Sequence, residues 1–553
     1  MLKMTIFCDK VTIDKRGPRL SGRRFESIEN GGKSMSWQNF NVALDTMDLS
    51  DQQFLRDYAA QSWDKYQVYP SSLHLRDGAV IYLVREDRDK KLVVYGGGPI
   101  RETFQGETVP GSRPAKVCPL NAANALVMRQ WFPFTAPVPL QRFPITVGLG
   151  DRLGIASPGH LRLLKRYPGV RPVLAQQSIR ELNLTGRNYQ EVLDAATWAV
   201  FQEDYQAGFG ADGDHLKTAA EVTMALDCGF TMITLDCSEH IDNGISNLSS
   251  HEVAEKYRQL PSDLRAHYEG IYLNKTFAVN GIRIEFASAD LAQTVLIYHQ
   301  AIQHTIRIYR EVIAAAAQTR AAAIDFEVSI DETLTPTAPQ AHFLVANELQ
   351  AAGVAVNSLA PRFCGEFQKG IDYRGDLAQF EREFTQHVQI AAYFQYKLSI
   401  HSGSDKFTVF PIIGRDTAGK FHLKTAGTNW LEAVRIVARY DPALFREMYD
   451  FAGRHLNEAK KYYHIAAEAE RIPAADRLGD AALPGLLSGD DARQVLHITY
   501  GLILQAQDDL GNSLFKERFS ELLFRHEAEY YQGLEQHIGA HLQLLGIADA
   551  RVL

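Results

Sequence analysis

Short apolar runs alternate with longer segments of helical period from Phe143 onward. An apolar run followed by an amphipathic segment is typical of a strand and its crossover helix, and repeats of this unit build a parallel sheet covered by helices. The strand candidates are residues 145–148, 173–176, 208–211, 231–235, 282–287, 323–329, 354–358 and 398–401. Eight such strands close a TIM-like (β/α)8 barrel, although residues 282–287 could instead form an inserted hairpin with residues 276–279.

The flanking regions have different patterns. Residues 1–40 are polar and glycine-punctuated and predict a loosely ordered extension, whereas residues 41–140 mix short β-like runs with glycine and proline. Residues 436–553 are helical in period, with long charged and apolar faces. We therefore expect an α+β N-terminal region at 41–140, the α/β barrel at 141–435 and a helical C-terminal cap at 436–553.

Composition narrows the class of protein. The chain of 553 residues is 46% hydrophobic and 22% charged with a formal net charge of −8, which is typical of a folded protein and argues against a nucleic-acid surface. No apolar stretch reaches the roughly 20 residues of a membrane span, and the N-terminus lacks a signal-peptide core. Five widely spaced cysteines predict no disulfide framework, so we expect a cytoplasmic location. The sequence is compatible with a homo-oligomer and does not fix the oligomeric state.

Polar residues gather where predicted strands end. In GADGDHLK, glycines allow a sharp turn that could bring Asp214 and His215 to one site, with His215 as a metal ligand and Asp214 either as a general base or as a carboxylate that orients His215. The alternative is that both cap the following helix. His401 likewise follows a predicted strand and precedes a small-residue loop. Neutral imidazoles from distant segments can share a divalent metal such as Mn, Co, Ni, Zn or Fe.

Two further segments supply carboxylates and cations. In the alternating run 323–332, Asp325, Glu327 and Ser329 share one face, and burial in a barrel would raise the pKa of Glu327 and suit it to acid or base catalysis. The alternative is a salt-bridged internal network. After the next strand, Glu366 is a candidate third metal ligand.

Cations near these strand ends could hold an anionic substrate, although a surface loop of solvated ion pairs is the alternative for residues 358–373. The candidate substrate-binding residues are Gln177, Lys217, Arg362, Lys369 and Asp405, and the reserve metal ligands are His240, His342 and His497. The run GLGDRLG has the spacing GxGxxxG rather than that of a dinucleotide fingerprint, and no zincin, serine-hydrolase or P-loop motif is present.

Five longer stretches carry a specific resemblance: GLGDRLGIASPGHL, RPVLAQQSIREL, GFGADGDHLKT, LAPRFCGEFQKGIDY and KLSIHSGSDKF. Together they resemble the tagaturonate epimerase family, which interconverts tagaturonate and fructuronate in bacterial hexuronate breakdown. The resemblance covers roughly residues 143–430, and residues 1–40 have no counterpart in it. It implies a divalent metal held by His215, Glu366 and His401, with Asp214 as proton acceptor and Glu327 as proton donor.

The chemistry of such an epimerisation constrains the mechanism. The two ketouronates differ at the carbon β to the ketone, whose hydrogen neither the ketone nor the carboxylate acidifies. We therefore expect retro-aldol cleavage, in which a carboxylate deprotonates the hydroxyl at that carbon and the metal stabilises the enediolate half. The alternatives are a ketohexose 4-epimerase acting on tagatose and fructose, a metal-dependent sugar-acid aldolase, and a sugar-acid binding protein without turnover.

Overall fold

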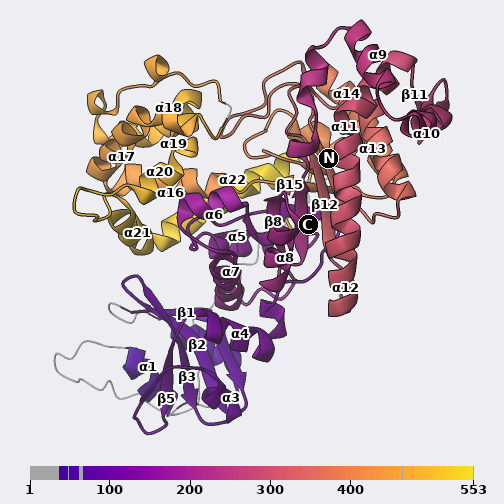
Figure 1. Cartoon of the computed structure of the whole chain (residues 1–553). Helices are drawn as coiled ribbons and strands as arrows, with labels where there is room; N and C mark the ends of the chain where they lie inside the picture. Colours follow the sequence, from indigo (N-terminus) through magenta and orange to yellow (C-terminus); the bar gives the residue numbers. More distant parts are fainter. Residues whose placement is uncertain (1–36, 46, 48, 62–65, 464, 552–553) are drawn as a thin grey trace, which may run out of the picture.

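The computed structural model describes residues 37–551 except 46, 48, 62–65 and 464 (Figure 1). Most of the predicted N-terminal extension therefore lies outside the described residues. A five-stranded antiparallel sheet in the order β1-β2-β3-β5-β4 follows, drawn in indigo at the bottom of Figure 1. Its elements are α1 (Trp37–Leu44), α2 (Gln52–Ala59), β1 (Tyr66–Arg76), β2 (Ala79–Glu86), β3 (Asp89–Gly96), α3 (Pro99–Thr103), β4 (Glu107–Val109), β5 (Ala115–Pro119) and α4 (Ala122–Trp131).

The two faces of this sheet have separate hydrophobic cores. One face packs beneath α1 and α2, where Phe40 and Leu55 are fully buried. The other packs against α4 and against Trp198 and Phe201 of a barrel helix, α7 (Tyr189–Glu203). An antiparallel sheet buried on both faces in this way is joined to the barrel by apolar contact rather than by a linker alone.

A closed eight-stranded parallel barrel forms the centre of the molecule, in the order β12-β13-β14-β15-β6-β7-β8-β9. Its strands are buried almost throughout, as expected when helices cover the outside and side chains fill the inside. They are β6 (Ile145–Gly148), β7 (Val170–Gln177), β8 (Gly210–Leu216), β9 (Met232–Asp236), β12 (Asp325–Ile330), β13 (Ser358–Pro361), β14 (Lys397–Ile400) and β15 (Phe421–Lys424). The predicted TIM-like barrel is confirmed.

The strand assignment needs one correction. Residues 282–287 do not enter the barrel, because β11 (Ile282–Glu285) pairs with β10 (Thr276–Val279) in an isolated hairpin. The eighth barrel strand is β15, which the sequence pattern missed. In β15, His422 and Lys424 alternate with apolar residues, and this sequence pattern is typical of a half-exposed segment. In the structure all four residues of β15 are buried.

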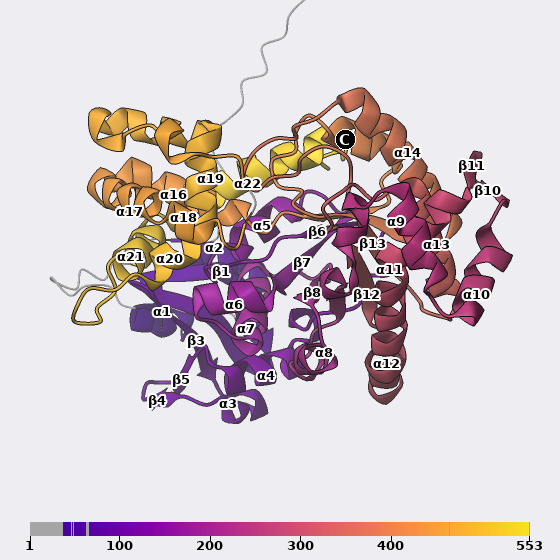
Figure 2. The ribbon, with the colours of Figure 1, turned by 45° about the horizontal axis from the view of Figure 1, so that its top comes forward.

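Helices cover the outside of the barrel, and an insertion with two of them projects beside it (Figure 2). The covering helices are α5 (Ser157–Leu164), α6 (Ile179–Thr185), α7, α8 (Ala219–Asp227), α11 (Ser288–Ile308), α12 (Ala314–Arg320), α13 (Pro339–Ala351), α14 (Leu377–Tyr393) and α15 (Phe410–Asp416). The insertion between β9 and α11 carries α9 (Ser250–Arg258), α10 (Ser262–Tyr272) and the hairpin.

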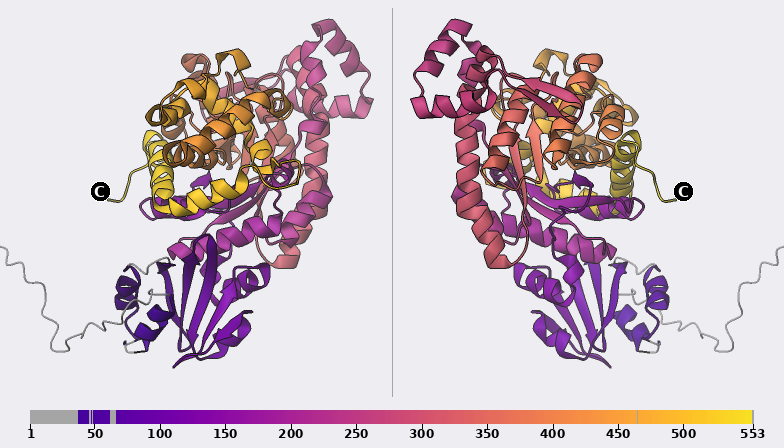
Figure 3. Two further views of the ribbon diagram at one scale, coloured as in Figure 1. Left: turned by 90° about the vertical axis from the view of Figure 1, so that its left-hand side faces the viewer. Right: turned by 90° about the vertical axis from the view of Figure 1, so that its right-hand side faces the viewer.

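The C-terminal helices form a second helical layer with its own core, seen in orange and yellow beside the barrel in Figure 3. They are α16 (Thr428–Tyr440), α17 (Pro442–Arg454), α18 (Leu456–Ala459), α19 (Asp490–Ile498), α20 (Tyr500–Gln505), α21 (Lys516–Arg525) and α22 (Glu527–Leu544). We call this layer the cap. Its core already includes Trp430 and Leu431 of α16, which precede the predicted boundary at residue 436. Within the described residues, none of the helices combines the length and apolar character needed to cross a bilayer.

Candidate active site

A cavity of about 270 Å³ opens where the barrel strands end. The end of β8 and the loops after β6, β7, β12, β13, β14 and β15 contribute to its lining, and Tyr462, Tyr463 and His497 of the cap complete it. The carboxyl ends of barrel strands are where TIM-type enzymes keep their catalytic groups. A ligand in this cavity would thus meet side chains of both barrel and cap.

A bulge in β8 brings two neighbouring side chains to this cavity. The register of β8 against β9 shifts between Gly213 and Leu216, and His215 has a φ of 52°. A histidine in this left-handed region is uncommon and is found where the surrounding structure imposes it. As a result both Asp214 and His215 line the cavity, with Nδ1 of His215 2.8 Å from Oδ1 of Asp214.

His215, Asp331 and His401 form a group suited to a metal ion. Each offers a ligand atom, and these atoms lie within 4.8 Å of one another. Nδ1 of His401 has no hydrogen-bond partner among the described residues, although it lies 3.2 Å from Oδ1 of Asp331. The predicted ligand Glu366 lines the same cavity but lies outside this group, with its carboxylate 4.0 Å from Arg362. Asp331 is the carboxylate that the structure places with the two imidazoles.

The surroundings of these imidazoles are strongly negative. Burial acts to lower the pKa of His215, but the Asp214 carboxylate outweighs it and raises the pKa to about 10. For His401, burial is likewise outweighed by Asp331, and the pKa is raised. The same field favours a divalent cation, and two imidazoles with one carboxylate match the donors that first-row divalent metals accept.

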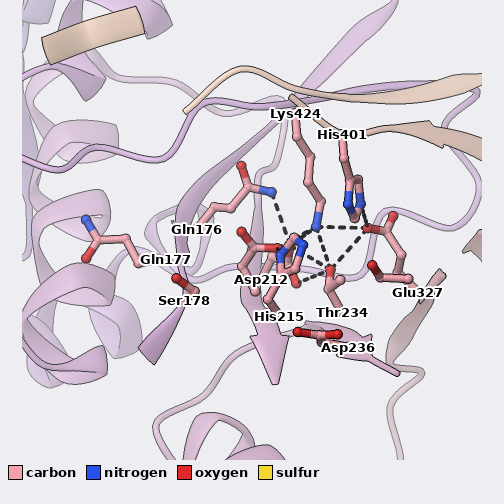
Figure 4. A network of polar contacts seen from close by, with 12 residues as sticks. Gln176, Gln177, Ser178, Asp212, His215, Thr234, Asp236, Glu327, His401 and Lys424 are labelled. Atoms are coloured by element: carbon pink, nitrogen blue, oxygen red, sulfur yellow. Dashed lines mark hydrogen bonds and ion pairs between the residues drawn. The ribbon is translucent and has the colours of Figure 1, made fainter. Parts of the chain in front are cut away.

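A lysine that the sequence analysis missed lies at the centre of the barrel's polar interior. Nζ of Lys424 lies 2.6 Å from Asp214, 2.7 Å from Thr234, 2.8 Å from Glu327 and 3.2 Å from Asp212. Figure 4 shows this cluster beside His401 and His215. We call Asp212, Asp214, Thr234, Glu327 and Lys424 the barrel network. Its members hold one another in place before any ligand arrives.

The barrel network changes the expected acidity of its carboxylates. Burial alone would raise the pKa of Glu327, as predicted, but Lys424 and His401 outweigh burial and hold the pKa well below its usual range. Asp212 is the carboxyl whose pKa is raised, chiefly by burial. Glu327 is 0% exposed, does not line the cavity, and contacts it only through Lys424 and His401. Glu327 therefore cannot touch a ligand in the cavity directly, and its effect on one would pass through Lys424 or His401.

Three cations line another part of the cavity, where Glu181 pairs with one of them. Arg152 is 3% exposed, bonds Glu181 through Nη2, and leaves Nε and Nη1 without partners among the described residues. Arg180 donates to the Tyr462 carbonyl at 3.4 Å, and no side-chain partner is described for the Lys369 ammonium. We call Arg152, Arg180 and Lys369 the cation group. Burial, Arg152 and Arg180 lower the pKa of Lys369 and outweigh the Glu181 carboxylate, which acts to raise it.

Three predicted substrate-binding residues lie elsewhere. Gln177 donates to the Asp151 carbonyl and points away from the cluster in Figure 4, whereas its neighbour Gln176 lines the cavity. Lys217 pairs with Glu239 at 3.1 Å, outside the lining. Asp405 bonds Arg493 at 2.7 Å and His537 at 2.9 Å, which ties the β14 loop to the cap. Successive strand residues face opposite sides of the sheet, so the residue of this pair that faces the cavity is Gln176 and not the predicted Gln177.

Of the three reserve metal ligands, two lie outside the cavity lining and one lies in it. His240 stacks on His304 with ring centroids 4.0 Å apart, and His342 is bonded to His387 and Tyr396 in a buried group outside the cavity lining. His497 alone among the three reserve ligands lines the cavity.

Two of the missed residues carried a usable signal. Asp331 continues the alternation of Asp325, Glu327 and Ser329 by one more step at the end of β12, so it was due to face the same side. Arg152 belongs to GLGDRLG, whose acidic residue, Asp151, accepts from the backbone of Leu153, Gly154, Ala156 and Ser157. That run is thus a capped loop and not a nucleotide site.

Comparisons with known proteins agree with the resemblance of the sequence. A family model described as tagaturonate epimerase matches residues 69–545. The chain is 42% identical over 482 residues to the tagaturonate/fructuronate epimerase of Thermotoga maritima, covering 87% of this chain and 97% of that protein. The glycerol complex of the fructuronate-tagaturonate epimerase UxaE from Cohnella laeviribosi superimposes with a TM-score of 0.85 at 51% identity, covering 91% of this chain and 100% of that one. Its native crystal structure also gives a TM-score of 0.85, covering 90% and 99%.

The match extends over the N-terminal sheet, the barrel and the cap, and the relatives are epimerases. The chain belongs to the tagaturonate epimerase family and is an isomerase.

Proposed function

We propose that this chain interconverts tagaturonate and fructuronate in the cavity at the barrel mouth. The observation that carries the proposal is that one cavity joins a metal-competent group and an acid–base network to cations that keep donor atoms unpaired. A ketouronate has a keto-polyol part and a carboxylate, and these match the two kinds of surface. The cavity of about 270 Å³ is near the lower end of ligand pockets, as suits a six-carbon acid.

The cation group would bind the substrate carboxylate. Arg152 and Arg180 can present guanidinium N–H groups to the two oxygens, and Lys369 adds a point charge from the β13 loop. A neutral ketohexose would bring no carboxylate to the unpaired Nε and Nη1 of the buried Arg152, which costs affinity. This favours the sugar acid over tagatose or fructose.

Asp214 is placed to act as the base. It lines the cavity, and although burial would raise its pKa, His215 and Lys424 hold the pKa well below its usual range and keep it ionised. We infer that Asp214 takes the proton of the hydroxyl on the carbon to be inverted while the bond to its keto-side neighbour breaks. A carbonyl forms at that carbon, and the electron pair of the broken bond passes to the ketone oxygen as the enediolate of the keto half. The aldehyde half then turns, the carbon–carbon bond re-forms on the opposite face, and the proton returns to the oxygen.

Lys424 and Glu327 would support this exchange. The ammonium touches Asp214 and Glu327 at 2.6 and 2.8 Å, so it fixes the base and offsets its charge. Because its pKa is held well below its usual range, Glu327 would be ionised and would act by positioning Lys424 and His401, the side chains that separate it from the cavity and that carry protons.

The trio of His215, Asp331 and His401 would hold the divalent cation, and Nδ1 of His401 already lies 3.2 Å from the Asp331 carboxylate that would share the ion. Such an ion, when bound, supplies positive charge to oxygen atoms that become anionic as the carbon–carbon bond breaks. Mn, Co, Ni, Zn and Fe all accept this donor set.

The test is to incubate the purified chain with tagaturonate and follow fructuronate, in deuterated water, with each metal and with a chelator. Interconversion without deuterium at the inverted carbon supports the proposal and its retro-aldol route. Deuterium at that carbon contradicts the route, and release of a three-carbon aldehyde as the main product identifies an aldolase. Absence of interconversion with every metal contradicts the assigned substrate.

A further inference from the structure

His497 brings an imidazole from the cap into the cavity. It lies in α19, is 2% exposed, and both ring nitrogens lack hydrogen-bond partners among the described residues. Buried polar atoms in native proteins are almost always paired, and an unpaired imidazole in a ligand cavity points to atoms that arrive with the ligand.

Two glycines form a slot around this ring. A Cβ at Gly427, in the β15 loop, would lie 2.2 Å from Cε1 and 2.4 Å from Nε2 of His497. A Cβ at Gly370, in the β13 loop, would lie 3.1 Å from Nδ1. The φ of Gly427 is −76°, which any residue adopts, so only the ring requires a glycine there. The ring is therefore held in one place against both loops of the site.

The surroundings of His497 keep it neutral. Burial, reinforced by Arg152 and Lys369, lowers its pKa well below the usual range. A neutral imidazole has one donor nitrogen and one acceptor nitrogen, whereas a carboxylate can only accept. A hydroxyl group can pair with either nitrogen, because it can both donate and accept a hydrogen bond.

We propose that His497 reads the hydroxyl group on the carbon next to the substrate carboxylate and so makes the site specific for a hydroxy acid. This inference rests on the proposed function and deepens it. Arg152, Lys369 and His497 line one cavity, and Gly370, which follows Lys369, lies against the ring, so a carboxylate bound by the cation group would place its neighbouring hydroxyl near His497. Holding that carbon lets the aldehyde half turn about a single bond without leaving the site.

The first experiment compares the full-length enzyme with His497→Leu on tagaturonate and on its analogue lacking that hydroxyl. For tagaturonate we expect KM to rise about 10- to 100-fold with kcat changed less than about threefold, because uniform binding is lost. For the deoxy analogue we expect the two enzymes to have the same KM. An unchanged KM for tagaturonate, or an equal rise for both substrates, overturns the inference.

A second experiment uses the glycine slot and does not depend on how well His497→Leu folds. Gly427→Ala should displace the ring and raise KM for tagaturonate, whereas in a His497→Ala background it should have no further effect. Equal effects of Gly427→Ala in both backgrounds contradict the inference.

His160→Leu is the matched control, because His160 is 1% exposed with both nitrogens unpaired but lies in α5, away from the cavity. It should leave KM unchanged, and a rise equal to that of His497→Leu contradicts the inference. Wild-type turnover of tagaturonate tests the proposed function separately, since it does not depend on the His497 variants.

Discussion

The two parts of the cavity differ in how completely their polar atoms are paired. In the barrel network, the ammonium of Lys424 alone has four oxygen neighbours within 3.2 Å. In the cation group, two nitrogens of Arg152 and the ammonium of Lys369 have no partner among the described residues. The hydrogen bonds and ion pairs of the barrel network thus fix the positions of its reacting groups before a ligand binds. The cation group keeps unpaired donors that a ligand can bind. Variants of the first should change kcat, and variants of the second should change KM.

Loss of the metal group should have the largest effect. Asp331→Ala should lower metal content and reduce kcat about 10³-fold, since a metal contributes several kcal/mol to stabilising charge in a transition state. Glu366→Ala is the matched variant and should keep its metal, because Glu366 lies outside the trio. Elemental analysis and turnover measure both. If Glu366→Ala loses metal and Asp331→Ala retains it, the ligand set is His215, Glu366 and His401.

Replacing the central cation should come next. Lys424→Met leaves Asp212, Asp214 and Glu327 close together without their shared ammonium, so we expect kcat to fall about 10²- to 10³-fold with KM nearly unchanged.

Lys397→Met is the control for this change, because Lys397 is also buried in the barrel but bonds the Phe143 carbonyl and Thr146 outside the cavity lining. A normal kcat for Lys424→Met would show that the network's pairing is not needed for turnover.

Most strands were predictable because buried strands have runs of apolar residues, and their polar ends were predictable because polar residues follow these runs directly in the sequence. β15 was not, since His422 and Lys424 are polar and their partners lie on other strands. Asp214, His215 and His401 were found from the strand-end pattern. The pairing within the barrel network and the free atoms of Arg152 and His497 depend on residues far apart in sequence, which no local pattern encodes.

A smaller effect is expected in the cation group. Lys369→Met should raise KM for tagaturonate about 10- to 100-fold with little change in kcat, because one charge-assisted hydrogen bond to the carboxylate is lost. Lys217 follows β8 and pairs with Glu239, so Lys217→Met should leave KM unchanged. Steady-state kinetics distinguishes the two, and equal KM values would remove Lys369 from carboxylate binding.

The smallest effect on turnover should come from Asp405→Asn. Burial would raise the pKa of Asp405, but His537 and Arg493 hold it below its usual range. The carboxylate therefore stabilises the fold above its unfolded pKa of about 3.9, and this stability is lost as the pH falls below that value.

Asp405→Asn should lower the free energy of unfolding by about 3–5 kcal/mol at pH 7 and flatten its acid dependence, with kcat and KM unchanged at temperatures where it is folded. Denaturant unfolding at several pH values measures this. An increase in KM without loss of stability would return Asp405 to the substrate site.

The division of the cavity is tested most directly by a crystal structure of the metal-loaded enzyme with a non-reacting ketouronate analogue. We predict the analogue's carboxylate within hydrogen-bond distance of Arg152 and Lys369, and the hydroxyl of the inverted carbon beside Asp214 and Lys424. A carboxylate bound instead at His215 and His401, with the cation group empty, would contradict the account.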